Sequence, residues 1–332
     1  MMKIVDMKLY TVELPFKAPI VTPKITLSTR QALILELVTD DNSHYFGECN
    51  AFDTDWYFDE TIEVVKQQLQ QWFEANKYKA FSTFEDIQQM VISLEAYPAT
   101  RSTIIMATYQ MFYKLYNITV DYGATVSGLT AERLQQLRDT QPKRVKVKWS
   151  NTIKADLQHL RALAHRPNLV IDGNESIAKN DAAHLTQLYA DDILYIEEPF
   201  YNLTTFNQVP NLPLAIDEKA ISTTAILDIV NNYNVEVVVL KPFRLGGLDR
   251  VLSLIQKLEQ YNVKTVIGGM YEYGLSRYFT AMLAQYATYP GDITPAGYYF
   301  QQDIVKDSGL LNNGRLEFNP PVIDLTQLTP VL

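Results

Sequence analysis

The sequence predicts an α/β barrel that follows a smaller α+β domain. In the second half of the chain, short apolar runs alternate with helical patterns, and most of these runs end on a polar residue. In the first hundred or so residues, strand-like runs come first and helical patterns follow in a block. The 332 residues, of which 47% are hydrophobic, can fill one large core or two ordinary ones, which excludes a disordered chain.

Residues 1–118 are expected to form the α+β domain. Pro and Asp-Asn turn signals separate three β-rich runs that predict an antiparallel meander, at residues 3–14, 30–39 and 44–49. Apolar residues at three- and four-residue spacing predict helices over residues 60–75, 83–94 and 102–115. Strands followed by helices in blocks are typical of this class of domain.

The barrel is expected to occupy residues 119–305. Its strands are predicted at residues 145–149, 169–171, 193–196, 214–216, 235–240 and 263–267. Intervening segments such as 154–164 and 248–259 have helical patterns. A first strand near residues 125–128 and a last one at residues 291–293 would bring the number to eight, and the short span predicts a shortened last helix. Residues 306–332 are expected to return to the first domain.

Charged residues recur at the ends of successive runs. They are Lys148, Asp172, Glu197, Asp217 and Lys241, at intervals of 24, 25, 20 and 24 residues. A strand, a turn, a helix and a return loop need about this many residues, given strands of roughly five and helices of roughly eleven. In a barrel the C-terminal strand ends converge on one mouth, so we expect these side chains to meet there.

Each of these residues alone is more often a turn, a surface charge or a helix cap, and their common register favours a site. Three converging carboxylates would repel each other unless a cation neutralised them. All-oxygen ligation is typical of Mg²⁺, whereas zinc prefers His or Cys. The four histidines, at positions 44, 159, 165 and 184, have no mutual spacing that suggests a metal site.

Lysines on both sides of the predicted metal suggest proton transfer. Lys146 and Lys148 project to the same side of their strand because the side-chain period is two. A neighbouring ammonium and a metal cation would both lower the pKa of Lys148 toward the range of a general base. Lys241 would face it across the mouth. This arrangement suits abstraction of a proton α to a carboxylate, with the cation stabilising the enediolate.

The charge and the cysteine count indicate which classes of partner and which cellular compartment to expect. A net charge of −9 without a basic block argues against nucleic acid as a steady partner. Cys49 is the single cysteine, which fits a reducing compartment, and no stretch resembles a signal peptide or a membrane span. We therefore expect a cytoplasmic protein with a small-molecule carboxylate substrate and no stable membrane insertion. A homo-oligomer is compatible with the pattern.

The motifs resemble those of the enolase superfamily. They are Lys-x-Lys, Asp-x-Asn, Glu-Glu-Pro, Asp-Glu and Lys-Pro-x-Arg-x-Gly-Gly, which begin at Lys146, Asp172, Glu197, Asp217 and Lys241. Together they resemble the muconate-lactonizing subgroup. Within it, Gly47-Glu48-Cys49 and Gly268-Gly269-Met270 are similar to the Firmicute o-succinylbenzoate synthase family, which includes N-succinylamino acid racemases. The resemblance implies a modified (β/α)7β TIM-type barrel with an α+β capping domain.

The resemblance also implies roles for individual residues. Those expected to bind Mg²⁺, or Mn²⁺ as a substitute, are Asp172, Glu197 and Asp217, supported by Lys146, Asn174 and Glu218. In a synthase, Lys148 would remove the α proton and then protonate the departing hydroxyl, while Lys241 would stabilise the enediolate. In a racemase both lysines would be acid/base partners. Substrate contacts are expected from Gly269, Met270 and Arg277, and the loops at 16–29 and 51–57 would cap the mouth.

The expected activity is a hydro-lyase reaction of menaquinone biosynthesis, dehydration of 2-succinyl-6-hydroxy-2,4-cyclohexadiene-1-carboxylate to 2-succinylbenzoate. The nearest alternative is an N-succinylamino acid racemase or a related N-acylamino acid racemase. A Schiff-base aldolase and a catalytically silent scaffold stay open as readings from other classes. One departure from the family pattern concerns Lys219, because serine or alanine is common after the Asp-Glu pair.

Overall fold

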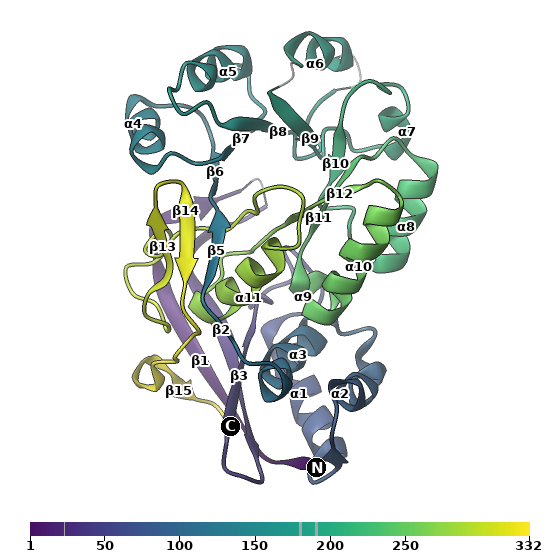
Figure 1. Ribbon diagram of the computed structural model, residues 1–332, viewed down its shortest axis with the longest axis vertical. Helices are drawn as coiled ribbons and strands as arrows, with labels where there is room; N and C mark the ends of the chain where they lie inside the picture. Colours follow the sequence, from purple (N-terminus) through teal and green to yellow (C-terminus); the bar gives the residue numbers. More distant parts are fainter. Residues whose placement is uncertain (23, 179–180, 190–191) are drawn as a thin grey trace.

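The computed structural model describes residues 1–22, 24–178, 181–189 and 192–332. Figure 1 shows antiparallel strands β1–β3 with helices α1–α3 at the end of the molecule where both termini lie, and strands β7–β10 with α4–α8 at the opposite end. Among the described residues, no helix combines the length and the apolar composition needed to cross a bilayer.

The N-terminal sheet has the predicted meander at its centre. Strands β1 (Met2–Val21), β2 (Thr26–Thr39) and β3 (His44–Cys49) pair antiparallel. The expected loop at residues 16–29 is wrong, because β1 and β2 continue pairing as far as Val21 and Thr26. Pro15 and Pro19 suggested a break, but a register shift between Pro15 and Ile20 accommodates them within the hairpin.

Three helices cover this sheet close to where they are predicted. They are α1 (Ile62–Asn76), α2 (Phe84–Met90), which a short 3-10 turn at Ile92–Leu94 follows, and α3 (Pro98–Phe112). Helix α3 begins four residues earlier than predicted, with Pro98 in its first turn, where a missing N–H is harmless. Both sides of α3 are buried, since it packs between β3 and the short helix α9 (Pro242–Leu245).

The second half confirms the predicted alternation of parallel strands and helices. One sheet has the order β12-β11-β10-β9-β8-β7-β6. Its strands are β6 (Gly123–Val126), β7 (Arg144–Lys148), β8 (Asn168–Asp172), β9 (Ile193–Glu197), β10 (Leu214–Ile216), β11 (Val237–Leu240) and β12 (Lys264–Ile267). The remaining helices are α4 (Ala131–Thr140), α5 (Ile153–Arg161), α6 (Ala182–Leu188), α7 (Leu203–Phe206), α8 (Thr223–Asn232), α10 (Leu248–Gln260) and α11 (Gly274–Ala284).

The predicted eighth strand is reduced to one contact. A single parallel bridge joins Gly268, just after β12, to Asp292. On the other side, a Cβ atom on Gly123 would lie 2.7 Å from the carbonyl oxygen of Gly291, so this segment passes directly beside β6. Residues 293–305, all described, contain no helix, so the expected shortened last helix is absent. The sheet is therefore described as seven paired strands rather than as a complete barrel.

The C-terminal residues contact two parts of the molecule. Strands β13 (Ser308–Asn312) and β14 (Arg315–Phe318) form a small sheet with β5 (Ile118–Asp121), whereas β15 (Thr329–Pro330) pairs with β1. The proposed domain boundaries at residues 118 and 305 stay a prediction.

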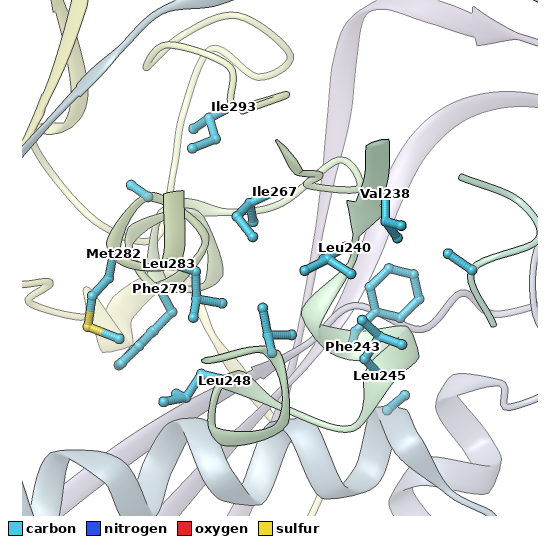
Figure 2. Packing of buried hydrophobic residues seen from close by; sticks show 14 of the residues in the cluster. Val238, Leu240, Phe243, Leu245, Leu248, Ile267, Phe279, Met282, Leu283 and Ile293 are labelled. Carbon is cyan, nitrogen blue, oxygen red and sulfur yellow. The ribbon is translucent and has the colours of Figure 1, made fainter. Parts of the chain in front are cut away.

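The core runs without interruption between the two halves of the chain. Figure 2 shows one part of it, with Val238 and Leu240 of β11, Ile267 of β12, and Phe243 and Leu245 of α9. A separate small cluster lies within the parallel sheet and consists of Val170, Tyr195, Ala215, Val237, Val239 and Val266. The apolar packing fixes the strands rigidly, and their register then sets the site: Lys148 pairs with Asp172, and Asp172 with Glu197.

Candidate active site

A cavity of about 500 Å³ lies at the C-terminal ends of the parallel strands. The predicted site residues that line it are Lys146, Lys148, Asp172, Asn174, Glu197, Asp217, Glu218, Lys241, Gly269 and Met270. Of the predicted set, only Arg277 does not line this cavity. The strand register described above thus brings residues from six strand ends to one mouth.

An inner network of charges holds Lys146. Its ammonium donates to Glu197 Oε1 at 2.8 Å and to Asp292 Oδ2 at 2.7 Å. The other oxygen of Asp292 accepts from Arg144 Nη2 at 2.5 Å, and Arg144 also donates to the hydroxyl of Tyr195. Sequence reasoning missed both Arg144 and Asp292 as site residues. Asp292 could have been noticed from its place after Gly291 in the last predicted strand.

A second group of contacts holds Lys241. Its ammonium donates to Asp217 Oδ2 at 2.6 Å and to the hydroxyl of Tyr57 at 2.9 Å. Arg244 donates to Asp217 Oδ1 at 2.8 Å and to the same hydroxyl at 3.1 Å. Burial alone would raise the pKa of Asp217, but Lys241 and Arg244 outweigh it and lower this pKa to about 2. Asp217 is therefore an anion held between two cations.

Around the other two predicted metal ligands, Asp172 and Glu197, carboxylates outnumber the cations that could neutralise them. Burial raises the pKa values of Asp172 and Glu197, and although Lys146 opposes the rise, the neighbouring carboxylates Asp217 and Asp292 add to it. Glu197 Oε2 is buried and has no hydrogen-bond partner among the described residues. A buried carboxylate oxygen without a donor is rare in native structures, and it is suited to a cation.

One observation speaks against a metal at Asp172, Glu197 and Asp217 as they stand, and their chemistry speaks for one. Within the described part of the chain, no three carboxylate, imidazole or thiol side chains are gathered around one point closely enough to hold an ion as they stand. Glu197 and Asp217 each turn an oxygen toward a lysine instead. The donors are nevertheless all oxygen, mutually repelling and directed into one cavity, and Glu197 Oε2 is free. Their chemistry fits a hard divalent cation such as Mg²⁺, with the site residues staying a prediction.

Lys148 differs from Lys146 and Lys241, the other two lysines at the strand ends, in its surroundings. It is exposed, and its ammonium lies 3.2 Å from Asn174 Oδ1. The amide of Asn174 in turn donates to Glu218 Oε1 at 3.3 Å. Asn174 adopts a left-handed conformation with φ 41°, which asparagine tolerates better than most residues. Lys148 thus has no carboxylate bound to it in the described residues and faces the open part of the cavity.

The N-terminal region supplies the outer wall of the cavity. Trp56 and Tyr57 come from the loop after β3, and Thr22 and Lys24 from the β1–β2 turn. Lys24 forms no ion pair with any described residue, and its backbone N–H donates to Thr22 Oγ1 at 3.2 Å. The predicted contribution of residues 51–57 to the mouth is supported by this placement. Nothing in the sequence around Lys24 singled it out.

Arg277 lies away from the cavity. It sits on α11, where its guanidinium donates to Asp303 Oδ2 at 2.7 Å and to the carbonyl oxygen of Ser308 at 2.9 Å. Its side chain is almost fully buried against the C-terminal strands. A substrate contact for Arg277 therefore stays a prediction that its position does not support.

Glu48 connects the N-terminal sheet to the N-terminus of α11. Its two carboxylate oxygens accept hydrogen bonds from the backbone N–H groups of Tyr273 and Ser276, each at 2.8 Å. Burial raises the pKa of Glu48 to about 8; the Ser276 and Tyr273 N–H groups oppose the rise, and the nearby Glu272 carboxylate adds to it. This contact orders the segment that follows the cavity residues Gly269 and Met270.

The pKa of Glu48 predicts a pH dependence of stability. The native carboxyl keeps its proton up to about pH 8, whereas an unfolded glutamate releases it near pH 4.5. In this window the native state binds more protons, so the free energy of unfolding should fall as the pH rises. Urea unfolding between about pH 5 and pH 8 should show a shallower slope for Glu48→Gln than for the wild type. Equal slopes would contradict the prediction, and Glu85→Gln on α2 is an exposed control.

Comparison with known proteins identifies similar chains. Residues 129–321 match the family model described as enolase C-terminal domain-like. An o-succinylbenzoate synthase from Listeria innocua is 25% identical over 93% of this chain and 90% of its own length. An N-succinylamino acid racemase from Amycolatopsis is 23% identical over 95% of this chain and 92% of its own length. A solved enolase-superfamily structure from Listeria innocua has a TM-score of 0.84 at 22% identity, covering 98% of this chain and 96% of its own.

Proposed function

Because this chain belongs to the enolase superfamily, whose enzymes are generally Mg²⁺-dependent, we propose that it is an o-succinylbenzoate synthase. The proposed reaction is the syn dehydration of 2-succinyl-6-hydroxy-2,4-cyclohexadiene-1-carboxylate to 2-succinylbenzoate. The observation that carries the proposal is the cavity in which Lys148 and Lys241 line one space with Asp172, Glu197 and Asp217. The similarity to o-succinylbenzoate synthases over most of the chain supports this choice of substrate.

The protein residues would divide the work as follows. Asp172, Glu197 and Asp217 would hold Mg²⁺, which supplies positive charge for the substrate carboxylate as electrons move onto it. Lys148 takes the proton from the carbon next to this carboxylate and, now an ammonium, gives a proton to the hydroxyl that leaves as water. The C–O bond breaks as the ring becomes aromatic, and the lysine ends as it began.

The contacts of the two lysines favour the synthase over the racemase. Lys241 is bound by Asp217 and Tyr57, which keeps it as a donor that can stabilise negative charge on the substrate. Within the described residues, the Lys148 ammonium is bound by the amide oxygen of Asn174 and by no carboxylate, which leaves it able to act as the base on one face of the substrate. A synthase needs one mobile base and one fixed cation, whereas a racemase needs two exchanging acid/base groups.

The outer wall of the cavity suits a substrate with a ring and a second carboxylate. Aromatic faces line it, from Trp56, Tyr271 and Tyr299. The Trp56 ring meets the Phe52 ring edge to face, with 4.9 Å between the ring centroids. Lys24, which forms no ion pair within the described part of the chain, lines the cavity on the side contributed by the N-terminal region. The succinyl carboxylate would bind there, while the ring carboxylate lies beside Lys146.

The proposal is tested by assaying one preparation with two substrates. The wild-type protein with MgCl₂ should convert the cyclohexadiene carboxylate to 2-succinylbenzoate, and EDTA should abolish the conversion. The racemase alternative predicts deuterium exchange at Cα of N-succinyl amino acids in D₂O, lost in either Lys148→Ala or Lys241→Ala. Deuterium exchange without dehydration would favour the racemase over the synthase. Dehydration that survives EDTA would contradict a role for Mg²⁺ in the proposed reaction.

Lys24→Gln should weaken recognition of the succinyl group. Losing a partly exposed ion pair of up to about 1 kcal/mol corresponds to a loss of affinity of up to about fivefold. Calorimetry with 2-succinylbenzoate should show this loss, whereas binding of benzoate, which lacks the second carboxylate, should not change. Lys114→Gln, an exposed lysine outside the cavity, is the matched control. Equal weakening for both ligands would contradict a role for Lys24 in succinyl recognition.

A further inference from the structure

Lys219 directly follows the cavity residues Asp217 and Glu218, at the position where the resemblance to the enolase superfamily leads us to expect serine or alanine. Its ammonium donates to Glu175 Oε1 and to Glu198 Oε1, each at 2.5 Å, and to the carbonyl oxygen of Phe200 at 3.1 Å. Glu198 is fully buried, and the Lys219 side chain is 15% exposed. Lys219 is not among the residues that line the cavity, whereas its partner Glu175 is.

The two carboxylates that bind Lys219 belong to the turns after β8 and β9. Asp172 ends β8 and is followed within three residues by Glu175, and Glu197 ends β9 directly before Glu198. Lys219 itself follows β10, two residues after Asp217. One ammonium therefore joins the three turns that carry the predicted metal ligands.

Further contacts tie these turns together. Glu198 Oε2 accepts from the backbone N–H of Asp217 at 2.7 Å, and the Glu175 N–H donates to the carbonyl oxygen of Glu198 at 2.6 Å. A Cβ atom on Gly173 would lie 2.6 Å from Cα of Pro199, so the first two turns pack backbone to backbone. The turns cannot shift independently.

The turns are also conformationally unfavourable by themselves. Asn174, Glu175 and Glu198 have φ values of 41°, 59° and 40°, in the left-handed region that residues with a Cβ rarely adopt. Such conformations persist only where surrounding contacts enforce them. Two of these three residues are the partners of the Lys219 ammonium, which is the cation that neutralises both of their carboxylates.

We propose that Lys219 is a positioning residue that orders the three predicted Mg²⁺ ligands by clamping Glu175 and Glu198. The inference rests on the proposed function only in that Asp172, Glu197 and Asp217 bind Mg²⁺. The Lys219–Glu198 contact fixes the turn that begins at Asp217, and the Lys219–Glu175 contact fixes the turn that places Asn174 on Lys148. Residues that orient metal ligands without touching the metal are a general feature of such sites.

A positioning role and a purely electrostatic role of Lys219 predict opposite changes in Mg²⁺ affinity when its charge is removed. Removing a positive charge close to a cation site should strengthen Mg²⁺ binding if Lys219 acts only through its charge. If Lys219 orders the ligands, the same change should weaken binding, by about 10–100-fold for a residue of this kind. The direction of the change in Mg²⁺ affinity therefore separates the two roles.

The experiment is a calorimetric titration of the full chain with MgCl₂, without substrate, at a temperature well below unfolding. Lys219→Met keeps the aliphatic stem and removes the charge, and we expect it to bind Mg²⁺ about 10–100-fold more weakly than the wild type. Lys219→Arg should restore most of the affinity, because it keeps the charge and the donors. Lys154→Met, on the exposed side of α5, removes an equal charge outside the clamp and should bind like the wild type.

Lys219→Gln keeps the measurement interpretable if Lys219→Met does not fold. Its amide can still donate to Glu198, so its Mg²⁺ affinity should lie between those of the wild type and Lys219→Met. Affinity equal to or tighter than wild type in either neutral variant would overturn the inference, as would a wild-type protein without a stoichiometric Mg²⁺ site. A wild-type protein that binds Mg²⁺ but makes no 2-succinylbenzoate would refute only the proposed function, because the titrations contain no substrate.

Discussion

Lys148→Ala is expected to lower kcat for formation of 2-succinylbenzoate by about 10²–10⁴-fold, the usual contribution of a general base. Among the three lysines at the strand ends, Lys148 is the one without a bound carboxylate in the described residues, so its amine is the one available there to accept a proton. Mg²⁺ binding should persist, because Lys148 is not one of the predicted ligands. Initial rates at saturating substrate measure the effect, and calorimetry with MgCl₂ shows that the metal site is intact.

Two further variants frame this result. Lys154→Ala removes an exposed lysine from α5 and should leave the rate unchanged. Lys241→Ala should lower the rate through the loss of a fixed positive charge, while leaving Asp217 with Arg244 as its partner. If Lys148→Ala kept a rate within tenfold of the wild type, the base would have to be another residue.

Asp292→Ala is expected to destabilise the fold by about 3–5 kcal/mol, the range seen when one partner of a buried ion pair is removed. Asp292 binds both Arg144, which is fully buried, and Lys146. Without it, the Tyr195 hydroxyl is the side-chain partner that Arg144 keeps among the described residues, and an uncompensated cation stays inside the sheet. The free energy of unfolding in urea, with the slope of the transition checked for constancy, measures the loss.

An exposed ion pair provides the matched control for this variant. Arg161 and Asp192 form a two-bonded pair in which each side chain is about one third exposed. Asp192→Ala should therefore change the free energy of unfolding by about 0–1 kcal/mol. A loss of similar size in the two variants would contradict the importance assigned to the buried network around Asp292.

The predicted strand ends were accessible from sequence because spacing and side-chain type act together in a parallel sheet. Apolar runs mark the buried strands, and the nearly constant interval between charged residues places those residues at equal depth. The pairing of Lys148 with Asp172 and of Asp172 with Glu197 follows from this register. Nothing local had to be known about side-chain conformation to place these residues at one mouth.

The ion-pair partners of the site residues could not be predicted from the sequence in the same way. Asp217 could face a metal, Lys241 or Arg244, and only the packed structure shows which donors it meets. Arg144 looked like an ordinary charged residue at the start of a strand, yet it lies inside the sheet because Asp292, 148 positions later, neutralises it. Lys24 and Arg277 depend on how distant segments fold over the strand ends, which spacing along one segment does not encode.

The prolines of the β1–β2 hairpin show that local conformational preference alone can predict the wrong structure. Pro15 and Pro19 favour a loop by their local conformational preferences, and the structure keeps both in β1 by shifting the register there. The longer hairpin brings Thr22 and Lys24 to the cavity, where a loop of unspecified shape was expected. Local propensity was overruled by pairing with β2.

The hydrogen bond from Lys241 to the Tyr57 hydroxyl joins residues 184 positions apart, and it ties the lysine to the wall that the N-terminal region contributes to the cavity. Tyr57 belongs to the wall that the N-terminal region places over the mouth, so any outward movement of that wall breaks the bond. Without this bond, Asp217 is the side-chain partner that Lys241 retains among the described residues. The orientation of Lys241 therefore depends on how the N-terminal region packs over the strand ends.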